Sequence, residues 1–218
     1  MQAHPFTTPR TARYISLGEP GPDIQHVWFC LHGNGQPVTD FAAQLINLDT
    51  PERLLILPEG LSRRAATAAA TPDTPATTAS WFAPESQAID LEDSTTFLNG
   101  LAAAILAECP ANVPITVLGY GHGATAACRW VANGQVPYDR LILYASVFPP
   151  EIDRRATLAN LPPRPITLIA TTTNAFTTEA AGEGLVHDLE EAGLPVQLRY
   201  VSEGPLTLAA LGATGEGA

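Results

Sequence analysis

Residues 115–133 read ITVLGYGHGATAACRWVAN, and this stretch decides the fold. An apolar run, 115–118, leads into Gly119-Tyr120-Gly121-His122-Gly123 and then into an alanine-rich segment. A short apolar run that turns through glycines into a helix-forming segment predicts a buried strand followed by a helix. The sequence around it should therefore build a sheet from repeated strand and helix units.

The turn in this stretch has the spacing of the G-x-S-x-G motif. In that motif a serine stands at the apex of a sharp strand-to-helix turn, where its hydroxyl is exposed for nucleophilic attack. The apex position here is Gly121, which has no side chain. The turn of a serine hydrolase is thus predicted without its serine, which makes it an open question whether the chain is an enzyme.

Strand-like and helix-like runs alternate along the chain. Most strand-like runs are almost continuously apolar, as in parallel strands covered on both faces, whereas the first alternates and is expected at an antiparallel edge. We therefore expect a single domain over residues 1–218, with a mostly parallel, twisted α/β sheet of about seven strands and helices on both faces. The strand-like runs are 12–18, 26–33, 53–60, 115–121, 140–147, 166–172 and 196–202, and the helix-like runs are 38–48, 88–108, 123–133 and 176–192.

Residues 65–79 form a low-complexity segment of Ala, Thr and Pro. This composition cannot build a core and predicts a mobile loop. The segment follows the third strand at its carboxyl end, the side on which open α/β sheets bind ligands. A flap over a pocket and an insertion without function both remain open.

Composition and charge exclude several classes of partner. The chain of 218 residues has a formal net charge of -11, and all 11 basic residues are arginine. An acidic chain is not expected to bind nucleic acid or an anionic membrane surface. No apolar stretch approaches the ~18 residues of a membrane span. The N-terminal residues lack the apolar core of a secretory signal, so a soluble cytoplasmic protein is expected.

The three cysteines do not form a pattern. Cys30 lies in a strand-like run and Cys128 in a helix-like run, so both are expected in the core, and Cys109 lies between elements. An odd count without regular spacing argues against a disulfide framework and against a zinc site. We expect no metal and no cofactor.

Four segments in order resemble the α/β-hydrolase fold, in particular its small phospholipase/carboxylesterase branch, which includes acyl-protein thioesterases. The segments are LHGNGQ (31–36), LPEGLSR (57–63), LGYGHGA (118–124) and FPP (148–150). The resemblance extends over roughly residues 12–212. It implies a pocket for an acyl substrate and a Ser, Asp and His triad in that chain order.

The resemblance places all three catalytic positions on unsuitable residues. The nucleophile position is Gly121, the acid position aligns with Asn174, and the base position aligns with Pro205. A serine needs a base to take its proton, and the base needs an acceptor that holds its tautomer. Loss of all three suggests that catalysis is no longer selected.

The oxyanion hole survives such losses because backbone N–H groups form it. By the resemblance, these groups belong to Asn34 and His122. We therefore expect a site that binds a small acyl or carboxylate ligand, with His32 and Trp81 as candidate contacts. His32 is alternatively a structural histidine that fixes the loop, and Trp81 alternatively packs in the core.

Three other residues have competing interpretations. His122 is a weak candidate for an independent base or nucleophile, because no orienting carboxylate is evident beside it. Ser146 is a candidate for a displaced nucleophile or an ordinary loop serine. Arg63 can neutralise an acidic ligand or serve solubility.

Three functions remain open at this stage. The first is a catalytically inactive pseudoenzyme that binds a small ligand or a protein partner at the old active site. The second is an active esterase or thioesterase with non-standard residues. The third is a structural or interaction protein. Whether the chain forms a homodimer is also open. Fold alone does not choose between them.

Overall fold

A computed structural model describes the chain except for residues 1–3, 5, 66–76, 172–178, 202–205 and 213–218. Seven strands form one sheet in the order β1-β3-β2-β6-β7-β8-β9, and only β1 pairs antiparallel to its neighbour in this sheet. The predicted parallel α/β sheet with an antiparallel edge is confirmed. Its strands are β1 (Tyr14–Leu17), β2 (His26–Leu31), β3 (Arg53–Pro58), β6 (Ile115–Tyr120), β7 (Arg140–Tyr144), β8 (Ile166–Thr171) and β9 (Val196–Val201).

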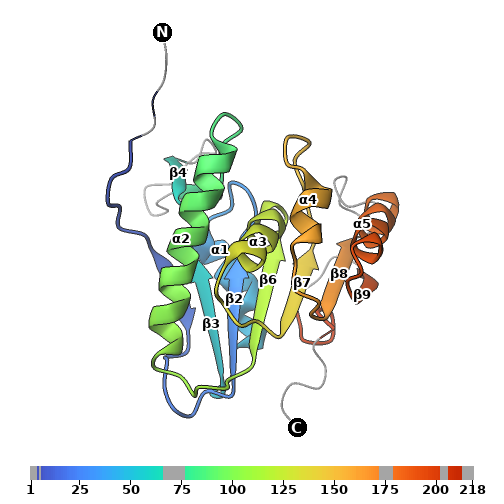
Figure 1. Ribbon diagram of the computed structural model, residues 1–218. Helices are drawn as coiled ribbons and strands as arrows, with labels where there is room; N and C mark the ends of the chain where they lie inside the picture. The colour runs from blue at the N-terminus through green and yellow to red at the C-terminus, as the bar shows by residue number, and fades with distance from the viewer. Residues whose placement is uncertain (1–3, 5, 66–76, 172–178, 202–205, 213–218) are drawn as a thin grey trace.

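Helices cover both faces of the sheet, and each face has its own apolar core. Side chains alternate between the faces along every strand: in β2, Phe29 belongs to one core and Trp28 to the other. Figure 1 shows α2, α3 and α4 in front of the sheet, over the first core. The opposite core packs beneath α1 and the turn near Leu211. The helices are α1 (Val38–Leu45), α2 (Gln87–Leu106), α3 (His122–Asn133), α4 (Arg154–Ala159) and α5 (Glu179–Glu191), with a 3-10 turn at Ile46–Leu48.

The ends of the low-complexity segment are ordered, which corrects the prediction of a loop over residues 65–79. Strands β4 (Ser62–Ala65) and β5 (Thr77–Ser80) pair antiparallel as a separate two-stranded sheet. The threonines of β5 suit a strand because their β-branched side chains fit the extended backbone. Residues 66–76 lie outside the described residues.

Helix α4 is a second element that periodicity did not predict. It has only six residues, too few for a 3.6-residue pattern to emerge. Its start nevertheless carries a signal, because the Asp153 side chain accepts a hydrogen bond from the N–H of Ala156 at 2.9 Å. Such an N-cap satisfies one of the free amides in the first turn.

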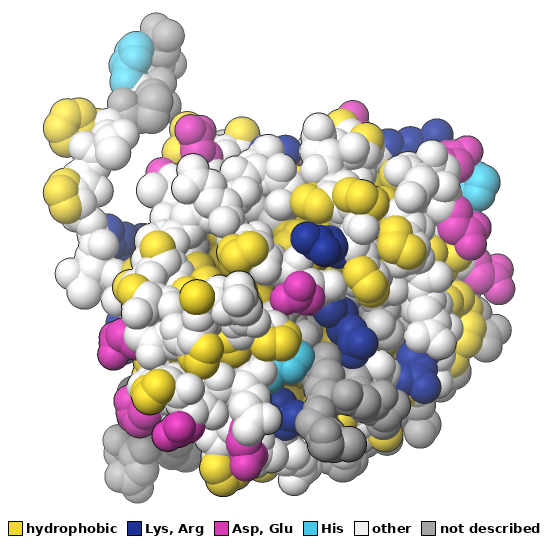
Figure 2. Space-filling view, turned by 60° about the horizontal axis from the view of Figure 1, so that its bottom comes forward, with side chains coloured by type: hydrophobic (Ala, Val, Ile, Leu, Met, Phe, Trp, Pro, Cys, Tyr) yellow, Lys and Arg dark blue, Asp and Glu magenta, His cyan; other side chains and the backbone are white. Residues whose placement is uncertain are grey.

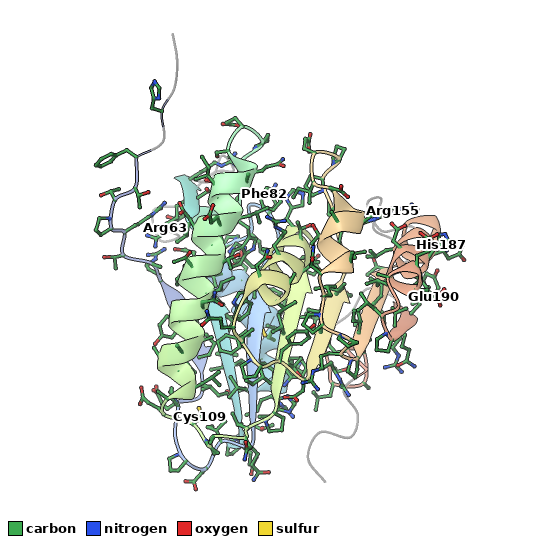
Figure 3. All side chains as sticks on the ribbon, in the orientation of Figure 1. Arg63, Phe82, Cys109, Arg155, His187 and Glu190 are labelled. Atoms are coloured by element: carbon green, nitrogen blue, oxygen red, sulfur yellow. The ribbon has the colours of Figure 1, made fainter. Side chains whose placement is uncertain are left out.

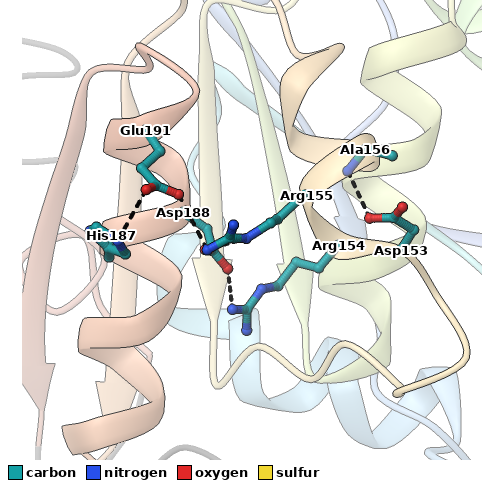
Figure 4. Close-up of polar contacts among 7 residues, drawn as sticks. All are labelled: Asp153, Arg154, Arg155, Ala156, His187, Asp188 and Glu191. Atoms are coloured by element: carbon teal, nitrogen blue, oxygen red, sulfur yellow. Dashed lines mark hydrogen bonds and ion pairs between the residues drawn. The ribbon is translucent and has the colours of Figure 1, made fainter.

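Helix α4 is joined to α5 by ion pairs around the buried carboxylate of Asp188 (Figure 4). Arg154 and Arg155 both contact this carboxylate, and Arg155 also lies 3.3 Å from Glu191. His187 lies on the outer side of α5, with a side chain that is 65% exposed. The pairs fix two helices that share few other contacts.

The surface carries the acidic excess without a single dominant patch on the face shown in Figure 2. There, acidic side chains lie mainly toward the margins of the view, and arginines lie nearer its middle. None of the described helices combines the length and apolar character needed to cross a bilayer.

Candidate functional site

The strand-to-helix turn after β6 is the centre of the site. Gly121 stands between β6 and α3 with φ 57° and ψ -120°, a conformation that strains residues with a side chain. Its N–H donates to the carbonyl of Tyr144 at 3.0 Å, and its carbonyl accepts from the N–H groups of Ala124 and Val147, both at 3.1 Å. The turn is therefore fixed to the segment that follows β7.

The glycines on either side of the apex serve a different purpose. A Cβ at Gly119 would lie 2.5 Å from the Cα of Ala124, and one at Gly123 would lie 2.3 Å from the carbonyl oxygen of Leu31. Both distances are far below van der Waals contact, so these glycines allow α3 to pack against the sheet. Of the atoms that the structure describes, a Cβ at Gly121 would meet the Cα of Gly33 alone, at 3.7 Å. The apex glycine thus relieves backbone strain and leaves its side-chain position open.

His32 supports the loop after β2 and does not face the pocket. Its ring is fully buried, with Nδ1 donating to the carbonyl of Gly33 at 2.7 Å and Nε2 accepting from the N–H of Gly60 at 3.0 Å. Both partners suit a neutral ring, and burial lowers the pKa of His32. The side chain therefore has no free nitrogen for a substrate, which favours the structural interpretation.

Trp81 also supports the loop that follows β2. It is 1% exposed, its indole N–H donates to the carbonyl of His32 at 2.8 Å, and the two rings lie 5.1 Å apart. Neither residue is among those that line the pocket described below. The structure does not bring His32 and Trp81 into the described pocket wall, and the ligand contacts expected of them stay a prediction.

The loop after β2 is held by hydrogen bonds that use the oxygens of its amide side chains. Gln36 Oε1 accepts from the N–H of Gly33 at 2.9 Å, and Asn34 Oδ1 accepts from the Ser80 hydroxyl at 2.6 Å. The N–H of Gly35 donates to Ala79 at 2.9 Å, which ties the loop to β5. The NH₂ groups of both amide side chains remain without a partner among the described residues.

His122 is the first residue of α3 and lies against an aromatic ring. It stacks on Phe82 with the ring centres 5.3 Å apart and an interplanar angle of 13°. Phe82 lies beside the upper end of α2, opposite the end that carries Cys109 (Figure 3). Partial burial lowers the pKa of His122. No described carboxylate or hydroxyl makes a hydrogen bond to its ring.

Ser146 does not form a nucleophile and base pair with His122. Its Oγ is buried and has no hydrogen-bond partner in the part of the chain that the structure describes. The preceding Ala145 has φ 47°, the one positive φ outside glycine in the described chain. A left-handed alanine costs on the order of 1–2 kcal/mol. The backbone after β7 is thus strained where it meets the turn at Gly121.

A pocket of about 430 Å³ lies at the carboxyl ends of β2, β6 and β7. Such volumes are typical of small-molecule sites. The structure brings Asn34 and His122 into its wall, and neither backbone N–H is used in a hydrogen bond among the described residues. Sequence reasoning did not single out Tyr120 or Gln36, although both lie within quoted motifs. The lining residues are Gly33, Asn34, Gln36, Tyr120, Gly121, His122, Ala145 and Val147.

The predicted acid and base positions cannot be placed. Asn174 and Pro205 lie outside the described residues. The strands that precede them, β8 and β9, end at Thr171 and Val201 and pair in parallel. Their assignment as degenerate catalytic positions stays a prediction from the resemblance.

Arg63 has a partner other than a ligand. Its Nε lies 2.6 Å from the carboxylate of Glu59, which also accepts two hydrogen bonds from Arg13, at 2.7 and 2.9 Å. Burial by itself would raise the pKa of Glu59, but the bonds from Arg13 and the charges of both arginines lower it below its usual range. The ion pair between Arg63 and Glu59 anchors the segment after β3, so the Arg63 guanidinium already has a partner within the fold.

Comparisons with known structures identify the fold. Esterase PE8 aligns over 93% of this chain and 95% of its own, with a TM-score of 0.67 and 16% identity. This chain has the α/β-hydrolase fold. A phospholipase/carboxylesterase from Dyadobacter fermentans aligns over 94% and 95%, with a TM-score of 0.61 and 18% identity. Acyl-protein thioesterase 2 from Zea mays aligns over 92% and 94%, with a TM-score of 0.63 and 17% identity.

These likenesses are structural. No protein-family model matches the sequence, and a comparison with curated protein sequences finds no match. The fold is therefore the carboxylesterase and thioesterase type of α/β-hydrolase, whereas the function has to be argued from the site.

Proposed function

We propose that this chain is a non-catalytic protein of the α/β-hydrolase fold that binds a small acyl compound in the pocket at Gly121. The observation that carries the proposal is that one pocket wall combines a missing nucleophile with residues whose backbone N–H groups have no described partner. The apex residue has no nucleophile, while Asn34 and His122 line the same pocket and their backbone N–H groups have no partner among the described residues. Such N–H groups bind a carbonyl oxygen whether or not a reaction follows.

The remaining candidates for catalysis give the proposal further support. His32 uses both ring nitrogens within the fold. His122 has no described carboxylate to orient its ring, and Ser146 has no hydrogen-bond partner that could take its proton. A nucleophile, a base and a group that orients the base are needed together. By the resemblance, Asn174 and Pro205 supply neither acid nor base.

Hydrolysis of p-nitrophenyl butyrate and of a butyryl thioester by the purified chain tests the absence of catalysis. We expect rates close to the background, because binding and N–H groups alone leave about 10³-fold acceleration over water. Turnover at about 1 s⁻¹ or faster would contradict the proposal. Matched His122→Ala and Ser146→Ala variants would then locate the chemistry, since each removes one candidate group.

A further inference from the structure

The side-chain position of Gly121 opens beside the predicted carbonyl-binding groups. Among the described residues, a Cβ built there meets a single atom within 4 Å, the Cα of Gly33 at 3.7 Å, which is ordinary contact. Gly121 lines the pocket together with Asn34 and His122. An atom of a bound molecule can therefore occupy the space that a side chain would fill.

The two amide side chains of the pocket wall present hydrogen-bond donors. The oxygens of Asn34 and Gln36 are taken by the Ser80 hydroxyl and by the N–H of Gly33, so their NH₂ groups are what remains. The backbone N–H groups of Asn34 and His122 add two more donors. Among the lining residues that the structure describes there is no carboxylate. A ligand with several acceptor oxygens and no donor fits this set.

A carboxylate matches these positions atom for atom. In an acyl-serine, one carbon carries a carbonyl oxygen, held by the backbone N–H groups, and the serine Oγ at the apex. A free carboxylate has the same carbon with two oxygens and needs no bond to the protein. With serine at the apex, Oγ would occupy the place of the second oxygen, whereas Gly121 leaves that place open.

We propose that the pocket binds a free monocarboxylate with a short apolar chain, one oxygen on the N–H groups of Asn34 and His122 and the other beside the Cα of Gly121. This inference rests on the proposed function of the pocket as an acyl-binding site. The apolar chain lies against Tyr120 and Val147, which line the same cavity. Charge-assisted hydrogen bonds favour the carboxylate over an uncharged ester or amide.

Calorimetric titration of butyrate, methyl butyrate and butyramide into the chain, in buffer free of carboxylates, tests the proposal. We expect butyrate to bind at least about tenfold more tightly than the ester or the amide, a difference of roughly 1.4 kcal/mol. Gly121→Ala should weaken butyrate binding about tenfold or more, because its methyl group lies too close to the place of the second oxygen for an unbonded atom. Equal binding of the acid and the ester, or unchanged binding of butyrate by Gly121→Ala, would overturn the inference.

Gly193→Ala is the matched control, because Gly193 has φ 73°, has no atom within 4 Å of its built Cβ, and lies after α5. It should bind butyrate like the wild type. If Gly121→Ala fails to fold, the preference for acid over ester in the wild-type chain still decides the inference. Equal binding of all three compounds would contradict only the carboxylate assignment, whereas binding of none would contradict the proposed function as well.

Discussion

Replacement of the three glycines at the turn should separate backbone strain from steric clash. Gly121→Ala places its Cβ in ordinary contact with Gly33 at 3.7 Å, so its cost comes from φ 57° alone. Such strain is about 1–3 kcal/mol. Alanine also restricts the unfolded chain, which offsets about 0.4–1 kcal/mol. The expected net loss in the free energy of unfolding is about 1–2 kcal/mol.

Gly123→Ala should be more damaging. Its Cβ would lie 2.3 Å from the carbonyl oxygen of Leu31 and 2.5 Å from that of His32, and both are backbone atoms that cannot move aside cheaply. We expect a loss of about 3 kcal/mol or more, at the upper end of overpacking effects. Gly193→Ala, with a positive φ but open space, should resemble Gly121→Ala.

Urea unfolding followed by circular dichroism measures these differences as shifts in the midpoint at constant slope. Equal losses for Gly121→Ala and Gly123→Ala would refute the argument that the apex glycine has room for a side chain. A Gly121→Ala variant as stable as the wild type would refute the argument that glycine relieves strain at the apex.

Three further predictions concern other parts of the fold. Burial, with the nearby charges of Arg53 and Arg140, lowers the pKa of His26 to about 4, while an unfolded histidine titrates near 6.5; the unfolded chain therefore binds more protons in this range, and stability should fall as the pH drops from about 6.5 to about 4. The free energy of unfolding of the wild type should fall by about 1–2 kcal/mol between pH 7.5 and 4.5, a value reduced by solvent screening around the partly exposed ring. Urea unfolding at these two pH values measures the fall, and His26→Gln should remove it. An equal fall in the variant would contradict the assignment. Asp188→Asn should lower the free energy of unfolding by about 1–2 kcal/mol, because it weakens the contacts from Arg154 and Arg155. His187→Gln, at an exposed position, should change it by less than about 0.5 kcal/mol in the same urea assay. In the native chain a thiol reagent should label Cys109 and spare Cys30 and Cys128. Burial raises the pKa of both core thiols, that of Cys128 to about 12. Mass spectrometry of the labelled peptides measures the labelling, and a Cys128 that reacted as fast as Cys109 would contradict the prediction.

The sheet was predictable because its strands carry their own signal. Runs such as 115–120 and 166–171 are mostly apolar, as is typical of buried parallel strands, and they alternate with helix-forming segments. Helix α4 and the pair β4 and β5 were not predicted. They are too short for periodicity, and β5 lies in a segment whose composition suggested a loop.

The candidate site was predictable to the level of backbone position. The spacing around Gly121 placed it between a strand and a helix, and the motif at 31–36 placed Asn34 near it. Side-chain direction was not predictable. Trp81 and His32 are polar-tipped residues that sequence alone does not orient, and it is their burial and the hydrogen bonds of their rings that show both facing inward.

A ¹H–¹⁵N correlation spectrum of the chain during titration with butyrate tests binding at the pocket itself. We expect saturable shifts that are largest for the backbone amides of Asn34 and His122, because both residues line the pocket and their N–H groups have no other partner among the described residues. Saturation with these two amides unmoved, or a spectrum that does not change at millimolar butyrate, would contradict it.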